Sequence, residues 1–199
     1  MLADDQEALA RLLVDPGLRR RWFADPSGEC FADLELGPAQ LASLRALDGR
    51  ALERVAASLV SKRRRAVLAT VPHCARLWPE LGDRYAELLV AAPARVEHLD
   101  PCLGPGPSEL LRLLPALRQA AARDDAAPLW LGDLLALELA RTCSHRDRQA
   151  RSLRCEHPVH EALDALDQGW LSVELEPRAH EYVVDAARLR WRPIGGAAP

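Results

Sequence analysis

Apolar side chains recur at helical spacing along most of this chain, and that period limits the folds open to it. The longest such segment covers residues 50–71. Its apolar stripe consists of Leu52, Val55, Ala56, Leu59 and Val60. Residues that recur every three to four positions share one face of an α-helix. Pro72 then ends the segment, because proline lacks the backbone N–H that a helix interior needs. The sequence therefore predicts a mostly helical protein.

Further segments with the same period predict helices over 5–24, 38–47, 79–90, 108–123, 128–142 and 159–167. The first of these is either one helix or two helices broken near Pro16. Prolines and glycines crowd residues 91–107, which we expect to form a loop, with Ser108 capping the helix that follows. Leucines surround most of segment 128–142, so we expect this helix to be central and mostly buried.

The pattern changes after residue 170. Residues 171–176 alternate strictly between apolar and polar side chains, and a period of two is typical of a β-strand. Short extended pieces are expected over 181–184 and 189–191, with a frayed end over 194–199. The predicted fold class is therefore mainly α, a helical bundle with a small C-terminal extended or β element (α+β).

Composition and charge limit the classes of molecule that the chain is expected to bind and the cellular compartment in which we expect it. The net charge of −3 argues against an electrostatic nucleic-acid binder. Apolar runs are all shorter than the roughly 18 residues that a membrane helix needs. The chain also begins with acidic residues, where a signal peptide would be basic. We therefore expect a cytoplasmic protein that binds neither nucleic acid nor a membrane, with its five cysteines as free thiols.

One cluster of thiols and imidazoles is a candidate metal site. It consists of Cys143, His145, Cys155, His157 and His160. Cysteine thiolate and histidine imidazole are the ligands that zinc and iron prefer. The spacing includes neither C-x-x-C nor H-x-x-x-H, so it matches no standard zinc signature. A small metal-binding protein therefore competes with the alternative of a polar surface connection.

Signals for catalysis are weak. Cys74 follows His73, but adjacency in sequence does not pair a thiol with a base. A carboxylate at Glu138, inside a strongly apolar helix, is costly to bury unless it is paired. We expect it on an exposed edge or paired with an arginine such as Arg141, with a catalytic acid as the alternative. The chain is therefore predicted not to be an enzyme.

The C-terminal region is the candidate peptide-binding part. An alternating strand with an open edge can pair with a peptide, and exposed aromatic side chains anchor partners. The predicted contact residues are Trp170, Val173, Leu175, Tyr182, Val184 and Trp191. An internal hairpin without a ligand is the alternative.

Three segments resemble a family of bacterial helical proteins. They are ALERVAASLVSKR (51–63), LWPELGDRY (77–85) and LWLGDLLALE (129–138). Members of this family accompany multinuclear non-heme iron oxidative enzymes that modify ribosomally made peptides (RiPPs). The resemblance implies that the iron belongs to the partner enzyme, that this chain carries no cofactor, and that it helps to present the precursor peptide.

Residues 8–48 separately resemble the small helical fold of the alpha subunit of protocatechuate-type ring-opening dioxygenases. The two resemblances together imply an N-terminal helical segment (1–48), a helical partner domain (49–142) and a peptide-binding C-terminal segment with short strands (143–199). The predicted function is a non-catalytic partner protein that binds an iron-dependent oxidase subunit and the precursor (leader) peptide. The alternatives are the small metal-binding protein and a dioxygenase accessory subunit.

Overall fold

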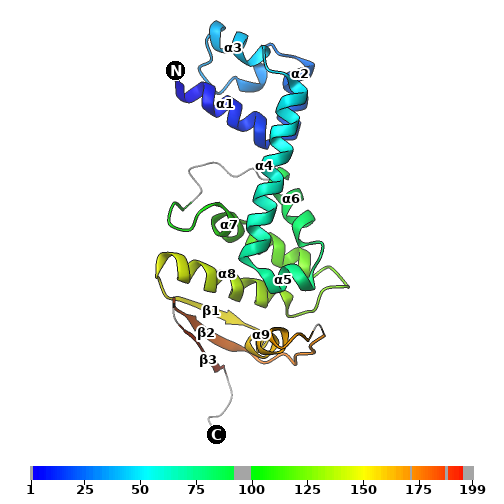
Figure 1. Cartoon of the computed structure of the whole chain (residues 1–199), viewed down its shortest axis with the longest axis vertical. Coiled ribbons are helices and arrows are strands. Elements are labelled where there is room, and N and C mark those ends of the chain that lie inside the picture. Colours follow the sequence, from blue (N-terminus) through cyan, green and yellow to red (C-terminus); the bar gives the residue numbers. More distant parts are fainter. Residues whose placement is uncertain (1, 92–99, 171, 187, 195–199) are drawn as a thin grey trace. The chain divides into compact units, whose positions relative to one another are not determined.

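The computed structural model describes residues 2–91, 100–170, 172–186 and 188–194, and these are mostly helical with a small antiparallel sheet near the C-terminus (Figure 1). The predicted fold class, mainly α with a small β element, is thus confirmed. The chain divides into two compact units. Unit 1 comprises Met1–Arg63 with Leu89–Pro93, and unit 2 comprises Arg64–Leu88 with Ala94–Pro199.

Unit 1 begins with two helices that a proline separates. These are α1 (Leu2–Val14) and α2 (Pro16–Ala24). Asp15 between them caps α2, because its side chain accepts a hydrogen bond from the amide of Leu18 at 2.8 Å. The segment 5–24 is therefore two helices, the second of the two predicted forms. A short 3-10 turn, η1 (Glu29–Phe31), and helix α3 (Pro38–Arg45) follow.

A small apolar core holds unit 1 together. Its buried members are Ala8, Leu12, Leu18, Trp22, Phe31, Leu44 and Leu52. Arg19 is buried beside this core and donates hydrogen bonds to the carbonyl oxygens of Leu12 and Leu13 near the end of α1. Its guanidinium also pairs with Glu53 at 3.0 Å. A cation at the carbonyl end of a helix satisfies acceptors that have no partner within that helix.

The predicted helix over 50–71 is α4 (Gly49–Thr70). Pro72 ends it and starts the short helix α5 (Pro72–Leu77), which α6 (Leu81–Ala91) follows. Within the described residues, no helix combines the length and the hydrophobicity that crossing a membrane requires. Residues 92–99 of the predicted loop over 91–107 lie outside the described residues.

Two long helices form the centre of unit 2. They are α7 (Pro105–Ala121) and α8 (Leu131–Asp147), which pack against each other. The prediction that Ser108 caps α7 was wrong, because the helix starts three residues earlier, after Gly104 in the left-handed region at φ 72°. The prediction for α8 was correct in its burial but misplaced in its bounds, since the helix starts at Leu131 and runs through residues 142 and 143 without a break.

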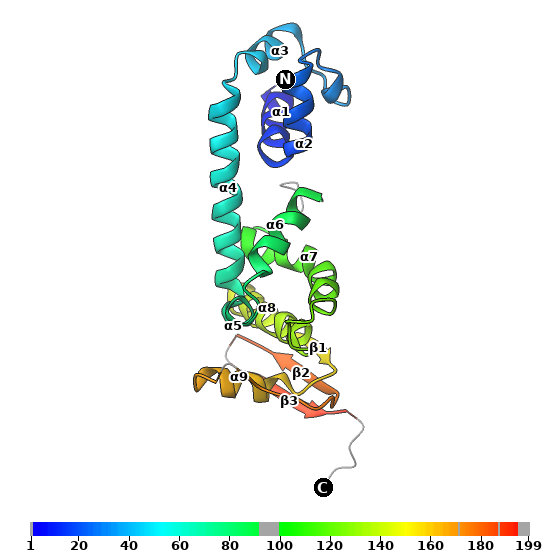
Figure 2. The ribbon, with the colours of Figure 1, turned by 90° about the vertical axis from the view of Figure 1, so that its right-hand side faces the viewer.

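The C-terminal part consists of three strands and one helix, in the order β1 (Arg151–Cys155), α9 (Val159–Asp167), β2 (His180–Val184) and β3 (Leu189–Pro193) (Figure 2). The strands form an antiparallel sheet in the order β1-β2-β3. Helix α9 and the extended pieces at β2 and β3 were predicted, whereas β1 was not. The strand predicted over 171–176 was wrong, because Ser172–Glu176 have no regular secondary structure and Leu171 lies outside the described residues.

Strands β1 and β2 of the sheet pack on α8, and alternate side chains of the central strand β2 are buried. His180, Tyr182 and Val184 of β2 are buried, and the two residues between them are half-buried. The hydroxyl of Ser144 in α8 donates a hydrogen bond to the carbonyl oxygen of Val184 at 3.2 Å. This contact fixes the end of β2, and with it the turn to β3, beside α8.

Candidate functional site

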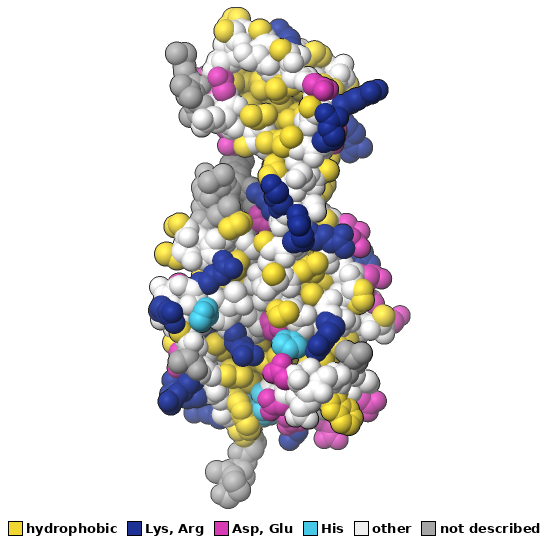
Figure 3. Space-filling model, viewed as in Figure 1, with side chains coloured by type: hydrophobic (Ala, Val, Ile, Leu, Met, Phe, Trp, Pro, Cys, Tyr) yellow, Lys and Arg dark blue, Asp and Glu magenta, His cyan; other side chains and the backbone are white. Residues whose placement is uncertain are grey.

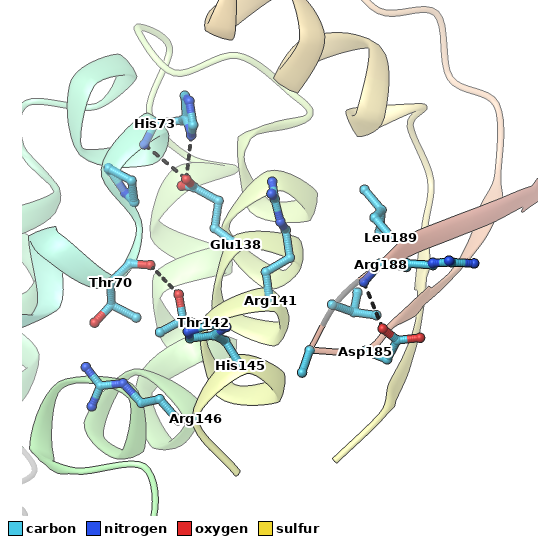
Figure 4. A pocket seen from close by; sticks show the side chains of 13 residues that line it. Thr70, His73, Glu138, Arg141, Thr142, His145, Arg146, Asp185, Arg188 and Leu189 are labelled. Atoms are coloured by element: carbon cyan, nitrogen blue, oxygen red, sulfur yellow. Dashed lines mark hydrogen bonds and ion pairs between the residues drawn. The ribbon is translucent and has the colours of Figure 1, made fainter. Parts of the chain in front are cut away.

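A pocket of about 550 Å³ opens beside α8 in unit 2. Its walls are one face of α8, the junction of α4 and α5, and the turn between β2 and β3 (Figure 4). Helix α8 contributes Glu138, Arg141, Thr142 and His145, which are three or four positions apart and so share a face. The hydroxyl of Thr142 donates to the carbonyl oxygen of Thr70 at 3.0 Å, which ties this face to the end of α4.

Glu138 lines this pocket, and both of its carboxylate oxygens accept hydrogen bonds. Its carboxylate accepts hydrogen bonds from the backbone amides of His73, at 3.1 Å, and Cys74, at 3.0 Å. The same carboxylate lies 2.7 Å from the imidazole Nδ1 of His73, whose Nε2 lies 3.0 Å from Asp167. The prediction that Glu138 is exposed or pairs with Arg141 was wrong, since it is only 5% exposed and caps α5 instead. The first amides of a helix have no acceptor within the helix, and the carboxylate of Glu138 supplies that acceptor for α5.

The thiol of Cys74 is unsuited to nucleophilic chemistry in this position. Burial raises its pKa well above the ordinary value, and the neighbouring Glu138 raises the pKa further. A thiol needs an electropositive, accessible environment to react as a thiolate. His73 and Cys74 are neighbours in the first turn of α5, where the backbone amides of both residues donate hydrogen bonds to Glu138.

The second acidic group of the pocket is also engaged. Asp185, in the turn between β2 and β3, accepts a hydrogen bond from the amide of Arg188 at 2.8 Å. It also pairs with the guanidinium of Arg190 at 3.3 Å. At the opposite end of the pocket, Arg146 donates a hydrogen bond to the carbonyl oxygen of Leu103. These contacts position the walls rather than leaving groups available for a ligand.

Two arginine side chains and one histidine side chain border the pocket without a polar partner among the described residues. Arg141, His145 and Arg188 are exposed, and within the described part of the chain their side chains make no hydrogen bond or ion pair. In Figure 4 the Arg141 side chain extends into the space between the His73 wall and the turn that carries Arg188. The pocket therefore offers uncompensated positive charge.

The outer edge of β3 lies next to this pocket. The amide of Asp185 bonds the carbonyl of Arg188, and the amide of Ile194 bonds the carbonyl of Ala179. Because bonded and non-bonded pairs alternate in an antiparallel ladder, Arg190 and Arg192 use their backbone groups to bond β2. The backbone groups of Leu189 and Trp191 therefore point to the outer edge, where no described strand pairs with them.

Trp191 is both anchored and accessible. Its indole stacks on the imidazole of His160 in α9, with ring centroids 3.8 Å apart, yet it remains 49% exposed. His160 also contacts His180 and Tyr182, whose hydroxyl lies 2.8 Å from the imidazole Nδ1. Burial lowers the pKa of His160, and the neighbouring His180 lowers it further. The cluster fixes β3 against α9.

The six predicted peptide-contact residues fall into separate environments. Tyr182 and Val184 are buried in β2, so neither side chain is available on a surface. Val173 and Leu175 are half-buried in the irregular segment, where the carbonyl of Val173 accepts a hydrogen bond from the indole of Trp130 at 3.1 Å. The two tryptophans, 170 and 191, are exposed.

The five candidate metal ligands are not brought together. Cys143 and Cys155 are buried, and burial is the main cause that raises the pKa of both thiols, that of Cys155 to about 12. His157 lies against Asp133 at 3.0 Å, His160 against Tyr182, and His145 borders the pocket. Within the described residues there is no group of three or more side chains placed to hold a metal ion.

Sequence reasoning did not identify the basic pocket. The signal available was the set of polar residues at positions 138, 141, 142 and 145, which lie three or four positions apart on one face of α8. That stripe shows which face of α8 is not covered by the core. It does not show that the turn before β3 lies opposite, because only the tertiary fold places Arg188 there.

Comparison with known proteins gave no match to a protein-family model, to a curated protein or to a solved structure.

Proposed function

We propose that this chain is a non-catalytic partner protein of RiPP biosynthesis. It binds the precursor (leader) peptide along β3 and an iron-dependent oxidase through its helices. The observation that carries the proposal is the open outer edge of β3, beside an exposed tryptophan and a basic pocket. The resemblance of residues 51–63, 77–85 and 129–138 to such partner proteins supports it.

The outer edge of β3 has the groups that strand addition requires. Leu189 and Trp191 each present an amide and a carbonyl outward, whereas Pro193 presents only a carbonyl. An extended peptide pairs with such groups through its backbone, and neighbouring side chains supply the specificity. Trp191 provides a large apolar contact next to this edge, and Trp170 is a second exposed aromatic side chain.

A peptide held on β3 is modified by proximity. Binding one end of the precursor near the oxidase turns a bimolecular encounter into an effectively intramolecular one. The iron supplies the oxidative chemistry from the partner enzyme. This chain supplies the peptide's position and direction.

Unit 1 offers a surface suited to the oxidase. A groove is lined by Phe23, Ala24 and Gly49 together with several arginines, among them Arg20 and Arg54, and one carboxylate, Glu53, which pairs with Arg19. Phe23 is 42% exposed, and hydrophobic side chains (yellow) gather on the face of unit 1 that Figure 3 shows. Exposed apolar patches with polar rims mark protein-protein interfaces. The arginine rim favours an acidic partner surface.

Co-purification tests the oxidase half of the proposal. The untagged chain is expected to co-purify with a tagged iron-dependent oxidase encoded beside its gene, with iron counted on the oxidase and not on this chain. Phe23→Asp is expected to abolish the complex, whereas Leu111→Asp, at an exposed leucine of unit 2, leaves it intact. A metal ion bound stoichiometrically to this chain alone overturns the proposal.

Strand addition is tested at Leu189. Replacement by proline removes the outward amide and leaves the bonds between β2 and β3 in place, while Leu189→Ala loses the same side chain but keeps the amide. Fluorescence anisotropy of the labelled precursor peptide encoded beside the oxidase gives the affinities. We expect Leu189→Pro to weaken binding much more than Leu189→Ala, with circular dichroism unchanged in both. Equal affinities contradict strand addition.

A further inference from the structure

We infer that the pocket bordered by Arg141, His145 and Arg188 binds a carboxylate, and that this carboxylate is an acidic side chain of the peptide held on β3. The second half of this inference rests on the proposed function. The first half, the carboxylate site itself, stands on the pocket alone.

The charges that line the pocket favour the binding of an anion. The acidic groups in its lining, Glu138 and Asp185, are already engaged by the amides of α5 and by Arg188 and Arg190. The guanidinium groups of Arg141 and Arg188 have no such partner among the described residues. Arginine presents a planar fork of donors that matches a carboxylate bidentately. Figure 4 shows the Arg141 side chain extending into the pocket, whereas the Arg188 side chain leaves the turn between β2 and β3 on the side away from Arg141. The fork of Arg141 therefore favours an anionic group in the pocket, and Arg188 adds positive charge at its border.

A carboxylate fits this pocket better than a phosphate. The lining includes two carboxylates of its own, and like charges close together repel. A phosphate group carries about −1.5 to −2 charges at neutral pH, whereas a carboxylate carries one. Repulsion from Glu138 and Asp185 thus penalises the dianion more, and the net spare positive charge suits a monoanion.

The position of the pocket allows it to bind a side chain of the peptide, next to the peptide segment that pairs with β3. Leu189 both lines the pocket and begins β3, which runs away from the pocket toward Pro193. A peptide on the outer edge therefore leaves β3 at the pocket. Its acidic residue follows the paired segment if the peptide is antiparallel to β3, and precedes it if the peptide is parallel.

The first experiment tests the pocket without any peptide. Glutarate and inorganic phosphate are titrated separately into ¹⁵N-labelled full-length protein. Glutarate is expected to cause saturable shifts of the amides around Arg141, His145 and Arg188, at lower concentration than phosphate. The Arg141→Gln/Arg188→Gln variant loses these shifts, and Arg123→Gln, an exposed arginine outside the pocket, keeps them. Absent or non-saturating shifts, or a preference for phosphate, overturn the carboxylate site.

The second experiment tests the peptide. Each acidic residue of the labelled precursor is replaced by its amide, and affinities are measured for the wild-type chain and for Arg141→Gln. One replacement is expected to weaken binding to the wild type by roughly tenfold or more, since hydrogen bonds to charged groups contribute that much, and to have little effect on Arg141→Gln.

The two parts fail in different ways. If the peptide binds and Leu189→Pro weakens it, yet no acidic residue couples to Arg141, the peptide assignment of the pocket is wrong and the proposed function stands. If glutarate binds in the pocket but the precursor does not bind the chain, the carboxylate site stands and the proposed function fails.

Discussion

The backbone amide of Cys74, in the first turn of α5, donates a hydrogen bond of 3.0 Å to the carboxylate of Glu138, 64 residues away in the middle of α8. The amide of His73 donates to the same carboxylate. Glu138 therefore does for α5 what a local capping residue does for α2, but from another helix. The contact ties the break after α4 to the central helix, and so sets one wall of the basic pocket.

Removing this carboxylate is expected to destabilise unit 2. Glu138→Ala leaves two backbone amides without an acceptor, at a cost of about 2–4 kcal/mol in the free energy of unfolding. Glu138→Gln retains one acceptor oxygen and is expected to cost less. Urea unfolding followed by circular dichroism measures both. Glu87→Gln, at an exposed carboxylate that pairs with Arg84, serves as the control and is expected to stay within about 0.5 kcal/mol of the wild type. An equal effect of the two Glu138 variants contradicts the capping role.

Stability is expected to fall at mildly acidic pH because of His160. Burial, and then His180, lowers the pKa of His160 below its ordinary value of 6.5. As pH falls through 6.5, the unfolded chain takes up a proton that the folded chain does not, so the free energy of unfolding decreases. The groups that act on His160 or contact it are Tyr182, Trp191, His180, Glu161, Asp164 and Arg178.

The pH effect is checked by comparing urea unfolding at pH 7.5 and pH 5.5. His160→Gln is expected to reduce the difference between the two pH values, because glutamine does not titrate. His145→Gln, at an exposed histidine, is expected to leave the difference unchanged. A wild-type protein that is equally stable at both pH values rules out the buried neutral imidazole as a determinant of stability.

The five cysteines are expected to differ in reactivity. Cys102 is exposed, whereas Cys74, Cys143 and Cys155 are buried and burial raises the pKa of each of these three thiols. Iodoacetamide at pH 8 should therefore label Cys102 first in the native protein. Mass spectrometry locates the label, and the urea-unfolded protein, in which all five react, is the control. Early labelling of any buried thiol conflicts with the packing described for α5, α8 and β1.

The indole of Trp130 is expected to hold the segment before β2 in place. Trp130→Phe removes the donor to the carbonyl of Val173, at a cost of about 1 kcal/mol, and should speed tryptic cleavage after Arg178. Trp78→Phe is the matched control, because it loses a bond to Asp124 instead. Cleavage after Arg178 is followed by mass spectrometry. If the two variants are cleaved there at the same rate, the anchor does not hold the segment.

Helical periodicity predicted most of the fold because it is a local property. The stripe of α4, the proline between α1 and α2, and the leucines around α8 each specify a helix through neighbours three or four positions away. The extended pieces at β2 and β3 were predicted for the same reason, from short runs of strand-forming residues. The predicted starts of α7 and α8 were wrong, because prolines and glycines lie in or just before the first helical turn.

The alternating pattern of Ser172–Glu176 predicted a strand incorrectly, because a strand also needs a neighbouring strand with which to pair. The place beside β2 is taken by β1, whose sequence shows no clear alternation, and the carbonyl of Val173 bonds the indole of Trp130 instead. Which segments pair is decided by contacts between residues far apart in the chain.

The sequence by itself determined where helices form, that the C-terminal region turns to short strands, and which side chains carry charge. Only the tertiary structure decided that Glu138 caps another helix, and that Arg141 and Arg188 line one pocket. The physical reason is range: periodicity acts over one or two turns of a helix, whereas burial, capping and charge balance depend on which distant segments meet.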